Sequence, residues 1–170
     1  TIVFSGTSAN LFTWTNSNTA IGLVANGTGN ISFTATNTSN SPITSTITVT
    51  PVNNVSTSFC DGNPITFSIT VNPKAQVNSI NNQTFCNGDT SALIEFSTVN
   101  VDGTTSYEWT NNNSTIGLAS SGTGNIAPFT AINTTNSPTV ATITVTPTYT
   151  NNGISCIGDS ITFTITVNPT

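Results

Sequence analysis

The stretch ITFSITVNP at residues 65–73 returns almost unchanged as ITFTITVNP at residues 161–169, and it decides the fold. Ile, Phe, Ile and Val alternate with Thr or Ser along both copies, which is the pattern of a strand with one buried face. The stretches ITSTITVTP (43–51) and VATITVTP (140–147) follow the same rule. A Pro closes each stretch, because proline has no N–H to donate to a ladder. The sequence therefore predicts half-buried antiparallel strands and an all-β fold.

These stretches belong to a tandem repeat. Trp14 and Trp109 lie 95 positions apart, and after one inserted residue the later Phe, Pro and Cys positions lie 96 apart. A period near 95 residues is too long for a solenoid repeat and has the size of one β-sandwich module. We therefore expect two units, residues 1–73 and 74–170, with a junction at about residues 72–76.

The composition excludes several functions. Charged residues make up 4% of the 170, with one Lys or Arg in total, no His and six acids. Binding to nucleic acid needs clustered Lys or Arg, and Lys74 stands alone. No apolar run reaches the roughly 20 residues of a membrane-spanning helix. Abundant Thr suits the outer faces of strands and abundant Asn suits turns, so the composition indicates an extracellular protein with neutral polar faces.

A repeated glycine motif resembles a nucleotide site at first sight. AIGLVANGTGNI (20–31) returns as TIGLASSGTGNI (115–126), and each copy has Gly, four residues, Gly and then Thr. A phosphate-binding loop needs a Lys after the second Gly and a helix after the loop. Neither copy has the Lys, and no helical pattern follows. We interpret the glycines as positive-φ positions in a loop that was copied with the module, and we predict no cofactor.

The two Trp residues have two interpretations. Trp14 in FTWTN and Trp109 in YEWTN could stack on a sugar, or they could be the inward Trp of a central sandwich strand. Phe12 and Tyr107 stand two residues earlier on the same face of each strand. We therefore expect both Trp side chains in the core.

The acids and cysteines give no sign of catalysis or metal binding. Glu95 and Glu108 are the only glutamates, and a carboxylate pair could hydrolyse a glycoside. The first unit has no counterpart of this pair, so we expect isolated surface acids. CNGDT (86–90) and CIGDS (156–160) carry one Asp each, too few for a calcium cage. Without His, neither a structural zinc site nor an activated catalytic Cys is expected.

The residues SYEWTNNNSTIGLASSGTGNIAPFTAINTTNSPTVATITVTPTY (106–149) and CIGDSITFTITVNP (156–169) resemble PKD-like repeats, named after polycystic kidney disease and immunoglobulin-like in type. Such repeats occur in very large secreted proteins of Bacteroidota, including proteins similar to flavobacterial gliding adhesins. The resemblance covers one complete unit (74–170) and one that lacks its opening strand (1–73). YEWTN departs from the Trp-Asp-Phe-Gly-Asp-Gly signature of ordinary PKD domains.

The resemblance implies two tandem antiparallel β-sandwich modules in a secreted or cell-surface protein. It implies export by type IX secretion and a non-catalytic role as structural or adhesive stalk repeats in gliding motility. The expected partners are neighbouring repeats of the same chain, with the secretion machinery and surface glycans as further candidates. The alternative is a carbohydrate-binding accessory module of a secreted enzyme, which needs exposed aromatic side chains. Tyr149 is the candidate for such a side chain.

Two kinds of modification site are candidates. DSI at 159–161 resembles the short O-glycosylation signal of the same phylum and marks Ser160, although the first unit has NPI instead. Asn-x-Ser/Thr triplets at Asn26, Asn37 and Asn133 are expected by chance in a chain this rich in Asn and Thr.

The three cysteines predict a disulfide. Secreted proteins with two Cys per repeat usually pair them, and the repeat register favours Cys86–Cys156 over the rival Cys60–Cys86. The partner of Cys60 should then lie about seven residues before Thr1, which leaves Cys60 unpaired within residues 1–170.

Overall fold

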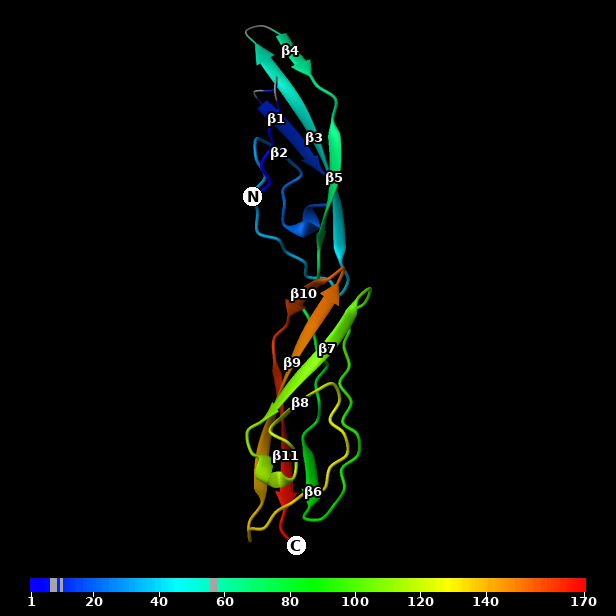
Figure 1. Cartoon of the computed structure of the whole chain (residues 1–170), viewed down its shortest axis with the longest axis vertical. Coiled ribbons are helices and arrows are strands. Elements are labelled where there is room, and N and C mark those ends of the chain that lie inside the picture. Colours follow the sequence, from blue (N-terminus) through cyan, green and yellow to red (C-terminus); the bar gives the residue numbers. More distant parts are fainter. Residues whose placement is uncertain (7–8, 10, 56–57) are drawn as a thin grey trace. The chain divides into compact units, whose positions relative to one another are not determined.

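The computed structural model describes residues 1–6, 9, 11–55 and 58–170, with side chains described outside residues 54–60. The described chain is all-β apart from two short 3-10 helices. It divides into two compact units, Thr1–Pro73 and Lys74–Thr170. Each unit is a sheet covered on one face by extended chain (Figure 1).

The first unit contains one five-stranded antiparallel sheet among its described residues. β3 is its central strand and pairs with β1, β4 and β5, while β2 pairs with the other edge of β1. The 3-10 helix η1 (Thr19–Ile21) lies between β1 and β2. The strands are β1 (Leu11–Asn16), β2 (Asn26–Thr28), β3 (Ile43–Val55), β4 (Ser58–Asp61) and β5 (Ile65–Val71).

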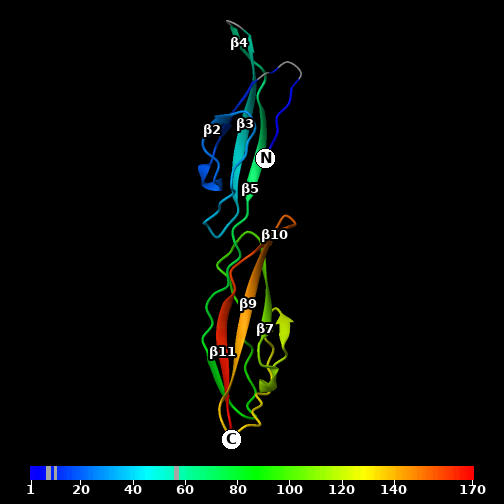
Figure 2. The same ribbon diagram turned by 90° about the vertical axis from the view of Figure 1, so that its left-hand side faces the viewer.

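The second unit repeats this arrangement and adds one strand. β9 pairs with β7, β10 and β11, and β8 pairs with β7; Figure 2 shows β9 between β11 and β7. The added strand β6 pairs with β11 in parallel, the one departure from the predicted antiparallel pattern among the described residues. The elements are β6 (Gln83–Cys86), β7 (Thr104–Asn111), η2 (Ser114–Ile116), β8 (Ser121–Thr123), β9 (Thr139–Asn151), β10 (Ile154–Ile157) and β11 (Ile161–Asn168).

The predicted alternation is confirmed in the long strands. In β9, Ala141, Ile143 and Val145 are fully buried, while the Thr residues between them face outward. Thr144 lies opposite Thr162 of β11, so hydroxyl groups form rows across the outer face. Each fully buried Ile or Val contributes about 1.5–3 kcal/mol relative to an exposed one. Asn152 and Gly153 form the tight turn that joins β9 to β10, with φ of 49° and 76°.

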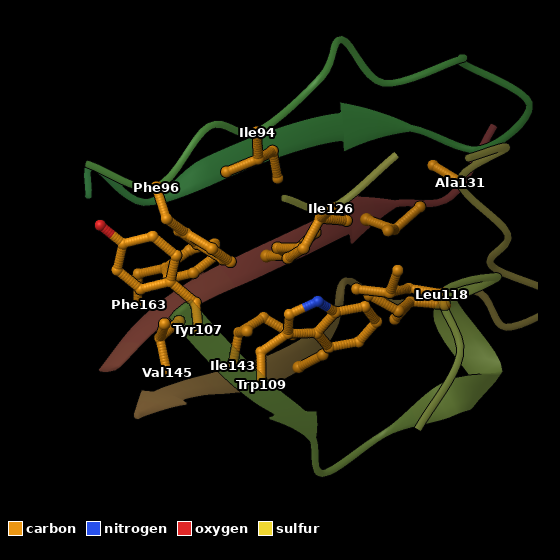
Figure 3. Close-up of a cluster of buried hydrophobic side chains, with 14 residues drawn as sticks. Ile94, Phe96, Tyr107, Trp109, Leu118, Ile126, Ala131, Ile143, Val145 and Phe163 are labelled. Carbon is orange, nitrogen blue, oxygen red and sulfur yellow. The ribbon is translucent and has the colours of Figure 1, made fainter. Parts of the chain in front are cut away.

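The second layer of each sandwich is extended chain held by isolated bridges. Ile2 pairs with Ile31 in the first unit, and Ile94 pairs with Ile126 in the second. Figure 3 shows Ile94 and Ile126 facing Trp109 across the core. The fold class is therefore a β-sandwich, as predicted, in which one layer is regular sheet and the other is mostly irregular.

Candidate functional site

The glycines of the repeated motif have structural roles. Gly22 and Gly117 end the two 3-10 helices with φ of 91° and 90°, a left-handed conformation that favours glycine. A side chain at either position would also strike a backbone carbonyl oxygen, that of Thr34 or Thr130. The interpretation of these positions as loop glycines is confirmed, and the short strands β2 and β8 follow where a phosphate loop would have a helix.

Gly27 and Gly122 are glycines for a different reason, which the sequence analysis missed. Neither has a positive φ. A Cβ at Gly27 would overlap the indole ring of Trp14, and one at Gly122 would overlap the ring of Trp109. In both units the Trp ring therefore lies directly against the backbone of the neighbouring strand. The repeated Trp–Gly spacing was the signal that could have revealed this contact.

Both Trp side chains are in the core, as predicted, and each is 6% exposed. Their indole N–H groups are buried and have no hydrogen-bond partner among the described residues. A sugar-stacking platform needs an exposed ring face, which neither Trp14 nor Trp109 provides.

Buried Asn side chains fix the loops that follow the Trp strands. Asn111 donates its amide hydrogens to the carbonyl oxygens of Leu118 (3.0 Å) and Ala119 (3.2 Å). Its Oδ1 accepts from the backbone N–H of Asn113 at 3.0 Å. Asn16 makes the same contacts in the first unit. Because these carbonyl groups have no strand partner, the side-chain amide replaces a missing ladder.

A second pair of Asn side chains ties a surface loop to the last strand. Asn133 is 5% exposed and donates to the carbonyl oxygens of Ser137 (2.9 Å) and Val167 (2.7 Å). Its Oδ1 accepts from the N–H and the hydroxyl of Thr135 at 2.9 and 2.8 Å. Asn37 makes the equivalent contacts in the first unit. The Asn-x-Ser/Thr spacing at these two positions therefore has a structural cause, which corrects its attribution to chance.

The two glutamates do not form a pair. Glu95 lies between the core residues Ile94 and Phe96 of the irregular layer, and Glu108 lies between two core residues of β7. Because neighbouring side chains in extended chain point to opposite sides, the two carboxylates leave the unit on opposite faces. Both are exposed, as expected for isolated surface acids.

Tyr149 is not an exposed aromatic side chain. It is fully buried, and its hydroxyl donates to the carbonyl oxygen of Val101 at 2.9 Å. Gly103 is in such close contact with the ring that any side chain there would overlap it. Burial raises the pKa of Tyr149, and the nearby Asp102 and Cys156 raise it further. The candidacy of Tyr149 as a sugar-binding residue is therefore wrong.

Asp89 and Asp159 make local contacts within the second unit. Asp89 accepts the N–H of Cys86 at 2.7 Å and closes the turn after β6. Asp159 forms an ion pair of 2.6 Å with Lys74, and the two side chains are 87% and 57% exposed. Within the described parts of the chain, no three His, Cys, Asp or Glu side chains are grouped to hold a metal ion.

The predicted Cys86–Cys156 disulfide is wrong. Both thiols are free; Cys86 is exposed and Cys156 half-buried. Cys86 pairs with Asn168 beside one end of β9, while Cys156 pairs with Tyr149 near the other end. The ten residues along β9 between these points span about 33 Å at roughly 3.3 Å per residue. A disulfide requires Cα atoms within about 7 Å of each other. Figure 1 shows β6 and β10 at opposite ends of the unit.

Cys60 and Ser160 are the two remaining candidate residues. The side chain of Cys60 is not among those that the structure describes. The expectation that Cys60 is unpaired therefore falls outside the described residues. Ser160 is exposed between β10 and β11, and its hydroxyl lies 2.7 Å from that of Thr146.

Comparison with known families agrees with this geometry. Among the described residues, no helix is long and apolar enough to cross a membrane. No curated protein matches the chain. The family described as PKD-like domain matches residues 83–170, which include every strand of the second unit. The chain therefore belongs to the PKD-like domain family.

Proposed function

We propose that the chain forms non-catalytic structural or adhesive stalk repeats of a large cell-surface protein. PKD-like domains are typically extracellular and non-catalytic. The observation that carries the proposal is that the structural contacts are present in both units, whereas the candidate reactive side chains are not. The Trp–Gly contact and both Asn networks occur twice, whereas the glutamates occur only in the second unit. Repetition has thus kept the architecture, and no repeated set of reactive side chains accompanies it.

The pairing of the outer strands supports a mechanical role. β6 is the first strand of the second unit and β11 the last, and they run in parallel from Gln83–Ile165 to Cys86–Asn168. Force applied to the two ends of this unit therefore acts along both strands in opposite directions. Their hydrogen bonds must break together in shear, instead of one after another as in a hairpin that is peeled open. Such an arrangement suits a repeat that holds a distal region away from the cell under tension.

Single-molecule stretching of the 170-residue chain tests this role. Unfolding of Lys74–Thr170 should give an extended chain of about 330 Å, at roughly 3.4 Å per residue. Gln83→Pro removes an N–H at the start of β6 that faces β11, and it should lower the force at which this unit unfolds. Ser121→Pro, in the edge strand β8, is the matched control outside the sheared pair. An unchanged force for Gln83→Pro, or an equal loss for both variants, would refute the mechanical argument.

The finer cellular setting is also part of the proposal. The parent protein is exported by type IX secretion in a member of the Bacteroidota and acts in adhesion or gliding, with neighbouring repeats and surface glycans as partners. Support comes from the sequence resemblance and from the neutral, Thr-rich outer faces. Surface proteolysis of intact cells should digest the protein in wild-type cells and spare it in a strain without that secretion system. Equal digestion in both strains would contradict this route.

Ser160 is proposed as an O-glycosylation site. Its exposure gives a glycosyltransferase access to the hydroxyl, and Asp159 precedes it in the required order. Intact mass of the native protein should show hexose additions that Ser160→Ala removes and Ser155→Ala keeps. A native mass equal to that of the bare chain would remove the assignment.

A carbohydrate-binding accessory role has less support. The exposed large hydrophobic side chains of the described residues are all Val, Leu or Ile, and both Trp rings and Tyr149 are buried. Sugar platforms depend on an exposed aromatic face, so no described side chain favours this function.

A further inference from the structure

The last strands of the two units have almost the same sequence and different burial. β5 reads ITFSITV and the matching part of β11 reads ITFTITV. The inward Phe, Ile and Val of β11 are at most 2% exposed, whereas the same three side chains of β5 remain partly exposed. Ile65, which begins β5, is 61% exposed, and its equivalent Ile161 is half-buried. Because the side chains match, the difference must come from what covers each strand.

In the second unit the cover is the segment of residues 75–91. Its middle part is β6, which pairs with residues 165–168 of β11. Asn82, just before β6, accepts the N–H of Thr164 through its Oδ1 at 2.9 Å. Val77, Ile80 and Phe85 of this segment pack against the core cluster. The segment thus supplies both a strand and apolar side chains.

The two ends of the segment bind elsewhere in the same unit. After β6, Gly88 donates its N–H to the carbonyl oxygen of Ala131 at 2.8 Å, and Ala131 donates to that of Asp89 at 2.8 Å. Before β6, Asn78 donates to the carbonyl oxygen of Ser97 at 2.8 Å. The segment is therefore held from three sides along the length of the unit.

The first unit presents the same three surfaces without a cover among its described residues. β5 pairs only with β3, so its other edge is open. Ala35 is exposed, while the equivalent Ala131 is fully buried. A hollow of about 380 Å³ lies beside Ser5, and in the second unit the equivalent Ser97 binds Asn78 of the covering segment. We call the edge of β5, loop 33–37 and this hollow the open face. The hollow is lined by Val3, Phe4, Ser5, Gly6, Phe12, Val49, Pro51 and Ile65.

We propose that the open face of the first unit is an acceptor for one extended segment with the chemistry of residues 75–91, bound as a parallel strand along β5. The repeat register places Gln83, Thr84 and Phe85 of such a segment opposite Ile69, Thr70 and Val71. Backbone hydrogen bonds hold the strand, and apolar side chains fill the hollow and cover β5. The segment contains one charged residue, Asp89, so recognition depends on shape and apolar contact.

The second unit indicates which kind of segment binds the open face. There a segment of this sequence covers side chains identical to those of β5 in kind and order, and its parallel direction is fixed by its bonds to β11. An uncovered apolar edge is also a site of association, since unpaired N–H and C=O groups of an edge strand recruit further strands. Supplying the segment removes both the exposed apolar surface and the open edge.

A synthetic peptide of residues 75–91 tests the proposal, with Cys86→Ser to prevent thiol exchange. Titrated into the 170-residue chain and followed by fluorescence anisotropy, it should bind saturably with one peptide per chain. Hydrogen exchange should slow in residues 65–71 and stay unchanged in residues 161–168, which are already covered. Absence of saturable binding up to millimolar peptide would overturn the proposal, and so would slowing confined to residues 161–168.

Matched variants separate this site from non-specific binding. Ala35→Arg should weaken peptide binding by about tenfold or more, since its equivalent Ala131 has no room for a larger side chain. Thr28→Arg, at an exposed position of β2 outside the open face, should change affinity by about twofold or less. A peptide with Phe85→Asp should bind as weakly as wild-type peptide binds the Ala35→Arg chain. Equal affinity of the Ala35→Arg and Thr28→Arg chains would overturn the assigned position.

Discussion

Replacing Gly122 with Ala should destabilise the second unit because the new methyl group collides with the indole ring of Trp109. The Cβ would stand 2.6 Å from Cε2 of the ring, whereas carbon atoms in contact normally lie about 3.5–4.0 Å apart. The ring must therefore move by about 1 Å. Its surroundings include Ile116, Ile143 and Val145, all fully buried, so the movement strains the core. Overpacking of this kind costs about 1–3 kcal/mol.

A double-mutant cycle makes this prediction specific. Trp109→Ala alone should cost about 3–5 kcal/mol as a large-to-small core change. In that background Gly122→Ala should cost well under 1 kcal/mol, because the methyl group no longer meets the ring. The coupling should therefore be about 1–2 kcal/mol. Gly124→Ala is the control: its φ of 66° makes Ala unfavourable by about 1–2 kcal/mol, but no atom lies within 4 Å.

The assay is denaturation of the 170-residue chain by urea. Unfolding is monitored by hydrogen exchange in peptides from β9, so that only the second unit is measured. Gly124→Ala should lower the free energy of unfolding by the same amount in the wild-type and Trp109→Ala backgrounds. If the costs of Gly122→Ala and Trp109→Ala simply add, the contact between backbone and indole ring is not the reason for glycine at position 122.

Three further predictions concern polar and ionisable groups. Tyr149→Phe should cost about 1 kcal/mol through the lost hydrogen bond to Val101. The folded-state pKa of Tyr149 is raised above 10.0, so its contribution is fully present below pH 10.0 and is lost as the pH rises through the folded pKa. Alkaline melting curves should show this loss in the wild type and less of it in Tyr149→Phe; equal curves would contradict it. Lys74→Gln should lower stability by about 1 kcal/mol or less, since the ion pair with Asp159 is exposed, and calorimetry showing a larger loss would contradict that view. Reducing agent should leave the melting temperature of the second unit unchanged because Cys86 and Cys156 are free. A lower melting temperature after reduction would instead support the Cys86–Cys156 disulfide.

The sequence predicted the long strands and the buried Trp residues because both follow from short-range patterns. Alternation in 140–147 fixes which side chains point inward, and aromatic residues two positions apart share a face. β6 was harder to foresee because QTFC is only four residues long and its partner β11 follows it by about 80 positions. No local pattern gives the direction of such a distant pairing.

The disulfide prediction failed for a related reason. Alignment of the repeats gives equivalent positions but not distances between different positions within one unit. Cys86 and Cys156 each stand next to a core strand, yet β9 carries the chain from one end of the unit to the other between them. The Asn networks were missed because Asn occurs so often in this chain that its buried and exposed copies look alike.

The Asn133 network has a consequence for making this protein in other cells. Asn133-Thr134-Thr135 is an acceptor sequence for N-linked glycan in hosts that modify Asn. In the folded unit both hydrogens of its side-chain amide are bonded, so an oligosaccharyltransferase can reach it only before β9 and β11 have paired. A glycan attached then would occupy the place of two carbonyl contacts and keep the loop from closing. Yield from a eukaryotic secretory pathway should therefore depend on whether folding or glycosylation is faster at Asn133 and at its equivalent Asn37.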